Sequence, residues 1–258
     1  TFTRAKDADG WHAYLDRYPQ GEYAPQAMLL LAQDALSAKQ YAEALAQASR
    51  LIERYPDGEF VAGALSVKGD SEAALEMIPQ ALDSYKQLEA RASDSGTLNH
   101  ARLGLLRAAR DLAMYEDVVA IADRLAGSST LGTGQLTEIS FIKATALNNL
   151  DRGDEAVAIW SSLAENTNDL NGIKSLYYLG QYYLDNGDQK RAREYADKLI
   201  DSNTPHSYWL ARGYILMSDI YRARGDNFEA DEYLKSLRSN YPGDEPDILN
   251  MIDLRLNP

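Results

Sequence analysis

Hydrophobic residues between positions 175 and 202 recur at helical spacing and indicate two helices joined by a short turn. One stripe of the first helix carries three large residues and a glycine: Leu176, Leu179, Gly180 and Tyr183. We expect Gly180 to leave room for a neighbouring helix. The turn is indicated at 186–188, where Gly187 can take a positive φ and Asp188 can cap the next helix. One face of that second helix carries Ala192, Ala196 and Leu199.

This two-helix plan repeats along the chain with a period of 36 to 38 residues. One position of the second helix is small in every unit: Ala44, Ala81, Val118, Ala156, Ala192 and Ala230. Four residues later come Ala48, Tyr85, Ala122, Trp160, Ala196 and Leu234, and three residues further on come Leu51, Leu88, Leu125, Leu163, Leu199 and Leu237. Tyr-Pro pairs at 18–19, 55–56 and 241–242 keep the same phase, and proline stops a helix. The constant phase predicts six repeated units over residues 20–242.

The two ends of the chain depart from this unit. Residues 1–19 carry Trp11 and Tyr14 at helical spacing, which is typical of the second helix of a repeat without its first helix. We therefore expect these two aromatic side chains to lack a preceding partner, so that the protein continues upstream or forms an oligomer through this end. Residues 243–258 predict a final amphipathic helix that covers the last unit.

The repeated unit resembles the tetratricopeptide repeat, with Leu179-Gly180 and Tyr183 in its first helix and small residues in its second. This resemblance implies an all-α fold: a right-handed α-solenoid of tandem helical hairpins with a C-terminal capping helix. It predicts one solenoid over residues 1–258, with a leading half repeat (1–19), six repeats (20–242) and a capping helix (243–258). The junctions at 16–29 (DRYPQGEYAPQAML) and 53–65 (ERYPDGEFVAGAL) are similar to those of bacterial envelope tetratricopeptide proteins, including outer-membrane assembly lipoproteins and periplasmic cell-division coordinators.

Composition narrows the choice of partner. The formal net charge is −13, from 26 basic and 39 acidic residues without clear segregation, so a nucleic-acid backbone would be repelled. The absence of cysteine excludes disulfides and thiol chemistry but fits the cytoplasm and the cell envelope alike. No hydrophobic run approaches the roughly 18 residues that a membrane span needs. We expect proteins or peptides as partners, with neither nucleic acid nor a direct membrane span.

The sequence contains no recognisable motif for catalysis, metal binding or phosphate binding. The three histidines, His12, His100 and His206, lie far apart and have no second histidine four residues on, so we expect no metal site. The glycine-rich stretch 127–134 (GSSTLGTG) lacks the lysine of a phosphate-binding loop. The turn carboxylates Asp151, Asp154 and Glu155 are typical of solvated caps. We therefore expect no catalytic residue, no metal and no cofactor.

The resemblance also implies a candidate binding groove, because the first helices of tetratricopeptide domains line a concave surface that contacts peptides. The positions in register are His100, Arg107 and Arg110 in the third unit; Glu138, Phe141, Asn148 and Asn149 in the fourth; Lys174, Tyr177, Gln181 and Asp185 in the fifth; and Arg212, Asp219 and Arg222 in the sixth. Amides of this set can bond a peptide backbone, and its aromatic and basic groups add contact area and charge. The tyrosine-rich fifth and sixth units are the favoured patch.

These features favour a non-catalytic protein–protein interaction scaffold that binds a peptide or partner protein in the concave groove, in cell-envelope assembly or secretion. A periplasmic or outer-membrane-associated location fits best, with the cytoplasm as the other option. One alternative is the superhelical arm of a larger envelope enzyme whose catalytic domain lies outside this chain. Another is a structural component of the outer membrane or of a secretion machine.

Overall fold

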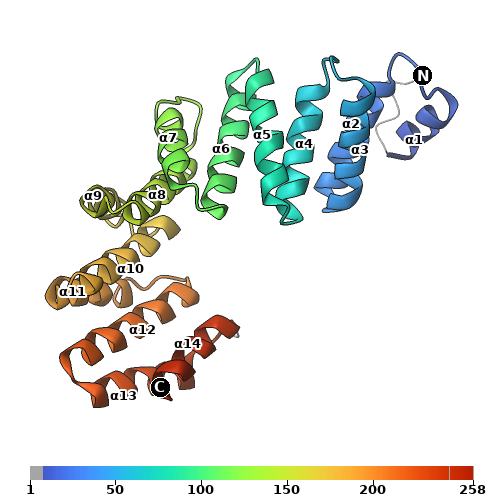
Figure 1. Ribbon diagram of the computed structural model, residues 1–258. Coiled ribbons are helices and arrows are strands. Elements are labelled where there is room, and N and C mark those ends of the chain that lie inside the picture. Colours follow the sequence, from blue (N-terminus) through green and yellow to red (C-terminus); the bar gives the residue numbers. More distant parts are fainter. Residues whose placement is uncertain (1–7, 244, 258) are drawn as a thin grey trace. The chain divides into compact units, whose positions relative to one another are not determined.

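The computed structural model describes residues 8–243 and 245–257, and every regular element within them is an α-helix (Figure 1). The helices are α1 (Ala8–Arg17), α2 (Ala24–Ser37), α3 (Tyr41–Arg54), α4 (Val61–Ala74), α5 (Ile78–Arg91), α6 (Ser95–Asp111), α7 (Tyr115–Ala126), α8 (Thr133–Asn149), α9 (Gly153–Leu163), α10 (Leu170–Asp185), α11 (Gln189–Ile200), α12 (Ser207–Arg224), α13 (Asn227–Asn240) and α14 (Pro246–Leu256). The prediction of an all-α chain is confirmed.

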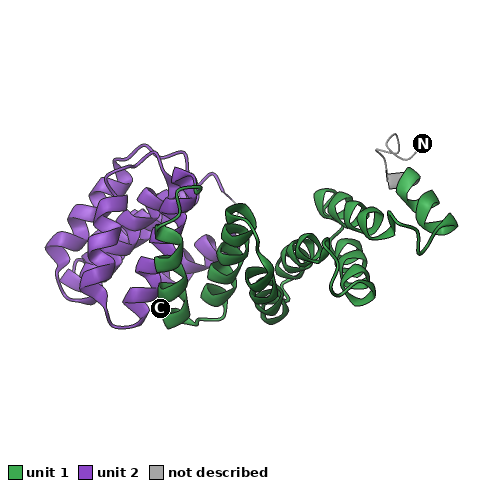
Figure 2. Cartoon of the chain, turned by 90° about the horizontal axis from the view of Figure 1, so that it is seen from above, with its two compact units in different colours: residues 1–131 green, residues 132–258 purple. Residues whose placement is uncertain are grey.

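The chain divides into two compact units, Thr1–Leu131 and Gly132–Pro258, which are described separately (Figure 2). In the first unit, the helical hairpins α2–α3, α4–α5 and α6–α7 pack in serial order, with α1 against α2. In the second, the hairpins α8–α9, α10–α11 and α12–α13 pack in the same way, and α14 lies against α12 and α13. First helices of successive hairpins also touch, as α2·α4, α4·α6, α8·α10 and α10·α12. This serial packing is that of an α-solenoid.

The repeated positions of the second helices form the core. All six residues of the small series, from Ala44 to Ala230, are fully buried, and the aromatic variants Tyr85 and Trp160 of the next series are buried with them. The leucine series is buried too, except Leu163, which is half-buried at the last residue of the short helix α9. The positions that repeat in the sequence are therefore the positions that are buried in the structure.

A residue with left-handed backbone joins the two helices of every hairpin. These residues are Lys39, Glu76, Ala113, Asp151, Gly187 and Gly225. After each of them, the next N–H donates to the carbonyl five residues earlier, for instance from Met114 to Ala109 at 2.9 Å. This bond satisfies a carbonyl at the helix end. Four of the six left-handed positions are not glycine, although glycine alone takes this conformation without a steric cost.

Replacing Ala113 with glycine is expected to raise the free energy of unfolding by up to about 1 kcal/mol, because glycine removes the left-handed strain at φ 54° and loses only part of that gain to backbone entropy. Ala120→Gly in the exposed interior of α7 is the matched control and should instead cost roughly 0.5–1 kcal/mol. Urea unfolding followed by circular dichroism measures both. Equal losses in the two variants would contradict the strain argument.

At the N-terminal end, Tyr14 packs on the helix that follows α1, and a contact of this end with preceding repeats or a second copy stays a prediction. Tyr14 is buried against Ala24 and Ala27 of α2, with Trp11 and Leu15 packed beside it. Its hydroxyl accepts a hydrogen bond from the backbone N–H of Tyr23 at 3.1 Å. Helix α1 thus packs against α2, the helix that follows it along the chain.

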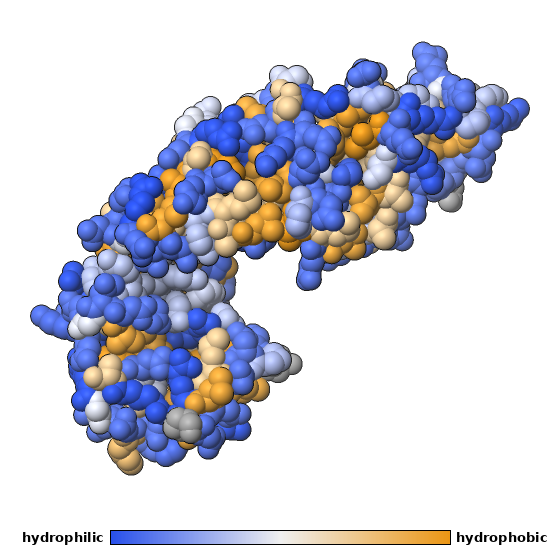
Figure 3. Space-filling model, in the orientation of Figure 1, coloured by the Kyte–Doolittle hydropathy of each residue, from blue (hydrophilic) through white to orange (hydrophobic). Residues whose placement is uncertain are grey.

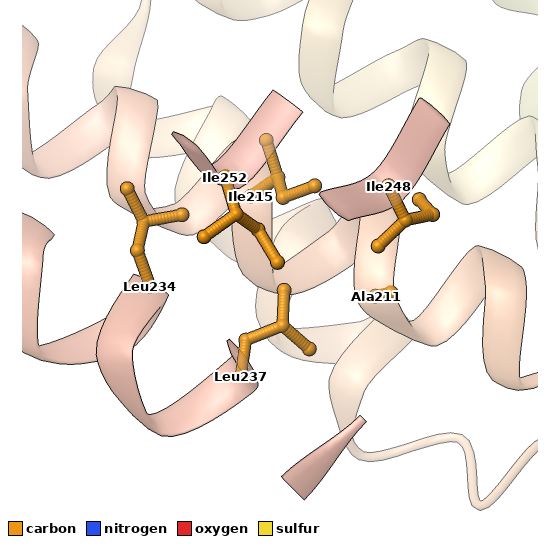
Figure 4. Close-up of a cluster of buried hydrophobic side chains, with 6 residues drawn as sticks. All are labelled: Ala211, Ile215, Leu234, Leu237, Ile248 and Ile252. Atoms are coloured by element: carbon orange, nitrogen blue, oxygen red, sulfur yellow. The ribbon is translucent and has the colours of Figure 1, made fainter. Parts of the chain in front are cut away.

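The expected final helix, α14, covers the last hairpin. Ile248 and Ile252 are completely buried among the hydrophobic side chains of α12 and α13: Ala211, Ile215, Leu234 and Leu237 (Figure 4). Arg255 of α14 is half-buried and paired with Asp219 of α12. Among the described residues, no helix combines the length and apolar character that crossing a membrane requires.

Candidate functional site

The predicted groove residues all lie on first helices of hairpins, but they fall into both compact units. His100, Arg107 and Arg110 are on α6 of the first unit. The remaining residues lie in the second unit: Glu138, Phe141, Asn148 and Asn149 on α8; Lys174, Tyr177, Gln181 and Asp185 on α10; and Arg212, Asp219 and Arg222 on α12. Because α10 touches both α8 and α12, the second unit brings its three groups of residues together.

Aromatic rings from these three helices meet in what we call the aromatic cluster: Phe141, Tyr177, Tyr178 and Trp209. Ring centroids are 5.3 Å apart for Phe141 and Tyr178, and 5.6 Å apart for Tyr177 and Trp209. The ammonium group of Lys174 lies 5.4 Å from the centre of the Phe141 ring and 5.8 Å from that of Trp209. All five side chains are half-buried, so part of each remains open to a partner.

Arg212 joins the aromatic cluster to the C-terminal helix. Its guanidinium donates to the Tyr177 hydroxyl at 2.6 Å and to the Tyr208 hydroxyl at 3.4 Å. Tyr208 in turn donates to the carboxylate of Asp247 in α14 at 2.7 Å. Partial burial, together with this hydrogen bond, raises the pKa of Tyr208. The Tyr208 hydroxyl therefore stays protonated at neutral pH, and it accepts a hydrogen bond from the guanidinium of Arg212 while donating to Asp247.

Asp219 and Arg222, by contrast, are occupied by partners within the chain. Asp219 accepts two hydrogen bonds from Arg255, from Nε at 2.7 Å and from a terminal nitrogen at 2.8 Å. Arg222 donates to the Asp231 carboxylate at 2.5 Å and to the backbone carbonyl of Arg255 at 2.6 Å. These contacts fasten α14 to α12 and α13. A role for the two residues in binding stays a prediction.

In the first unit, His100 belongs to a polar group between α4 and α6. Its Nε2 lies 3.1 Å from Oδ1 of Asp70, which also accepts a hydrogen bond from the Tyr85 hydroxyl at 2.8 Å. The contact with the Asp70 carboxylate raises the pKa of the His100 side chain, while partial burial opposes this. His100 also lines a cavity of about 520 Å³ between α2, α4 and α6. Arg110 pairs with its neighbour Asp111 at 2.8 Å.

A second cavity, of about 400 Å³, lies in the second unit where the ends of α8 and α10 approach the start of α9. Three predicted residues line it, Asn148, Gln181 and Asp185. Sequence reasoning did not assign its other lining residues: Asp151, Gly153, Trp160, Tyr178, Tyr182 and Asn186. The sequence does mark Trp160 as unusual, because three other repeats have alanine at that position.

Two further observations concern metal binding and the exposed hydrophobic surface. Within the described residues, no group of three histidine, cysteine or acidic side chains is placed to hold a metal ion. On the face shown in Figure 3, hydrophobic residues reach the surface as separate patches among hydrophilic ones. The cavities and the aromatic cluster, rather than a broad apolar surface, are thus the defined features of the two units.

Comparisons with known proteins agree with this architecture. A family model described as tetratricopeptide repeat matches residues 174–203 and 208–244, and the outer membrane lipoprotein family YfiO matches residues 5–93. No curated protein sequence matches the chain.

Solved structures share the fold over most of the chain. A type IV pilus biogenesis factor, PilW, is 19% identical with a TM-score of 0.63, over 90% of this chain and 99% of PilW. YrrB, a tetratricopeptide protein with an unusual peptide-binding site, is 19% identical with a TM-score of 0.62, over 79% and 97% of the two chains. The apo quorum sensor NprR of B. thuringiensis is 12% identical with a TM-score of 0.73, over 96% and 74%. The chain thus has the fold of tetratricopeptide-repeat proteins, its residues 174–203 and 208–244 match that repeat, and it resembles members of that class from the bacterial envelope.

Proposed function

We propose that this chain is a non-catalytic binding module that holds a peptide or a protein segment against the first helices of residues 132–258. The observation that carries the proposal is the aromatic cluster with Lys174, which spans three successive first helices, α8, α10 and α12. Half-buried aromatic rings offer large contact area at a low cost in side-chain entropy, and such residues dominate binding energies at protein interfaces.

The polar surroundings of the cluster fit a peptide ligand. Arg212 is held against Tyr177 and is thereby preorganised, so little entropy is lost when a partner packs on it. Gln181 donates to Asp185 at 2.8 Å, which leaves the second amide hydrogen of Gln181 for a partner's backbone carbonyl. Gln181, which accepts from the Tyr177 hydroxyl at 3.5 Å, thus adds to the cluster a group that can bond an extended chain.

The setting that we propose is the cell envelope, in assembly or secretion. The match of residues 5–93 to an outer membrane lipoprotein family supports it, as does the structural likeness to a pilus biogenesis factor. We further propose that residues 1–258 act as one solenoid whose N-terminal end contacts further repeats or a second copy. The formal charge of −13 disfavours nucleic acid as the ligand.

The test is crosslinked capture of partners from cells that make the protein, with wild type and a Lys174→Glu/Tyr177→Ala variant. We expect recovery of the specific partner to fall at least about tenfold in this variant, because it removes a central aromatic contact and reverses the charge beside it. Phe228→Ala is the matched control, since this aromatic side chain is 73% exposed in the same unit but lies on a second helix, α13.

Circular dichroism of the three proteins checks that each is folded. If the double variant and wild type recover every partner equally, binding does not use the aromatic cluster. If Phe228→Ala loses the partner while the double variant keeps it, the binding face is the second helices instead.

A further inference from the structure

The cavity at the ends of α8 and α10 combines aromatic walls with an acidic rim. Trp160 and Tyr178 lie with ring centroids 5.4 Å apart, and Tyr182 covers Gly153 so closely that a Cβ there would come within 2.5 Å of its ring. Asp151 and Asp185 are exposed at the opening. At about 400 Å³, the space is large enough for an amino-acid side chain with part of its backbone.

The electrostatics of the cavity favour a cation. Its described lining contains two carboxylates and no lysine or arginine. It also lies at the C-terminal ends of α8 and α10, where the carbonyl ends of the helix dipoles carry partial negative charge. The N-terminal end of α9 carries partial positive charge, but the carboxylates of Asp154 and Glu155 in its first turn offset that charge. The neighbouring Arg152 is bound to Glu155 by two hydrogen bonds, at 2.6 and 2.8 Å.

The wall of the cavity also contains a buried hydrogen-bond donor that lacks an acceptor. Trp160 is completely buried, and its indole N–H has no acceptor among the described residues. A buried donor without a partner is costly, and because this nitrogen has no access to solvent, a ligand's acceptor removes that cost only when the wall opens around it. A simple metal cation carries no acceptor. A residue within a peptide carries its backbone carbonyl.

We propose that this cavity binds the side chain of an arginine residue in the partner peptide. The inference rests on the proposed function and adds a specificity to it, because Asn148, Gln181 and Asp185 belong both to the cavity and to the predicted groove. A guanidinium is planar and stacks on aromatic rings such as Tyr178 and Tyr182. Its fork of donors matches the carboxylates of Asp151 and Asp185. The peptide carbonyl supplies an acceptor of the kind that Trp160 lacks.

The test follows the indole N–H signals of the ¹⁵N-labelled protein by nuclear magnetic resonance during titration with N-acetyl-arginine-N-methylamide. The chain has three tryptophans, and Trp160→Phe assigns the signal of interest. We expect the Trp160 signal to move saturably while those of Trp11 and Trp209 move little. The citrulline analogue, equal in shape but uncharged, should bind at least about tenfold more weakly, and the lysine analogue should also bind more weakly.

A charge-matched pair of variants completes the test. Asp151→Asn/Asp185→Asn should weaken arginine binding at least about tenfold, since it removes both rim charges. Asparagine tolerates the left-handed backbone at position 151, so the fold should persist. The control Glu194→Gln/Asp201→Asn removes two exposed charges of the same unit outside the cavity and should bind arginine like wild type.

The titration needs no native partner, so it tests the arginine site independently of the proposed function. An unmoved Trp160 signal, or equal binding of arginine and citrulline, would overturn the arginine site and leave capture through the aromatic cluster intact. Equal binding of arginine and lysine would overturn the assignment to guanidinium. Saturable, charge-dependent binding in the cavity would support it even if the Lys174→Glu/Tyr177→Ala variant still captures every partner.

Discussion

Replacing Lys68 with methionine is expected to lower the free energy of unfolding by about 3 kcal/mol, because it leaves a buried carboxylate without its counter-charge. Lys68 Nζ donates to Glu72 at 2.6 Å and to the Ser84 hydroxyl of α5 at 2.7 Å, and that hydroxyl donates to the other Glu72 oxygen at 2.5 Å. Glu72 is only 3% exposed, and Ser84 is fully buried. The methylene stem of methionine can replace that of lysine, so the lost charge dominates the effect.

Urea unfolding at neutral pH, followed by circular dichroism, measures this change. Lys86→Met is the matched control, since Lys86 is exposed on α5, and it should stay within about 0.5 kcal/mol of wild type. A triple variant, Lys68→Met/Glu72→Leu/Ser84→Ala, should recover most of the loss, because removing the whole polar group leaves nothing buried and unpaired. If the single and triple variants are equally unstable, packing rather than charge is responsible.

Replacing Gly104 with alanine is expected to cost about 1–3 kcal/mol through overpacking. A Cβ at Gly104 would lie 2.5 Å from two atoms of the Tyr85 ring, and one at Gly69 would lie 2.8 Å from the same ring. Tyr85 is 4% exposed and fills the space between α4 and α6, which the two glycines leave open. Its hydroxyl bond to Asp70 limits how far the ring can move aside.

Two measurements separate this clash from other effects of alanine. Gly127→Ala serves as the control, because no atom lies within 4 Å of a Cβ there and the backbone φ is −84°. Its free energy of unfolding should be close to that of wild type. In a Tyr85→Leu background, Gly104→Ala should lose most of its cost, since the ring is gone. An unchanged cost in that background would assign the effect to the helix backbone and not to Tyr85.

The hairpins could be predicted from the sequence because their signals are local. A helix shows its buried face through residues three and four positions apart, and the repeated alanine and leucine positions are buried where that rule places them. The turns at Gly187 and Gly225 carry the residue that a left-handed backbone favours. The turns at Glu76 and Ala113 have the same backbone without that residue, so their conformation could not be read from composition.

The candidate site was predictable only in part. The register of the first helices assigned Phe141, Lys174, Tyr177 and Arg212 to successive first helices, and these helices touch in the structure, while their role in binding stays a prediction. It did not show that Trp160, from a second helix, lines a cavity with Gln181 and Asp185. Nor did it show that Lys68, which departs from the usual large apolar residue of the repeat, is held by Glu72 and Ser84.

The sequence by itself determined the repeated helical hairpin, its period and the residues that fill its interior, because these depend on spacing within one or two helices. The tertiary structure decided which side chains meet between helices: Tyr14 with α2, Arg255 with Asp219, and Trp160 with the ends of α8 and α10. Such pairings depend on the distance and rotation between packed helices, to which many weak contacts contribute, and no interval along the chain encodes them.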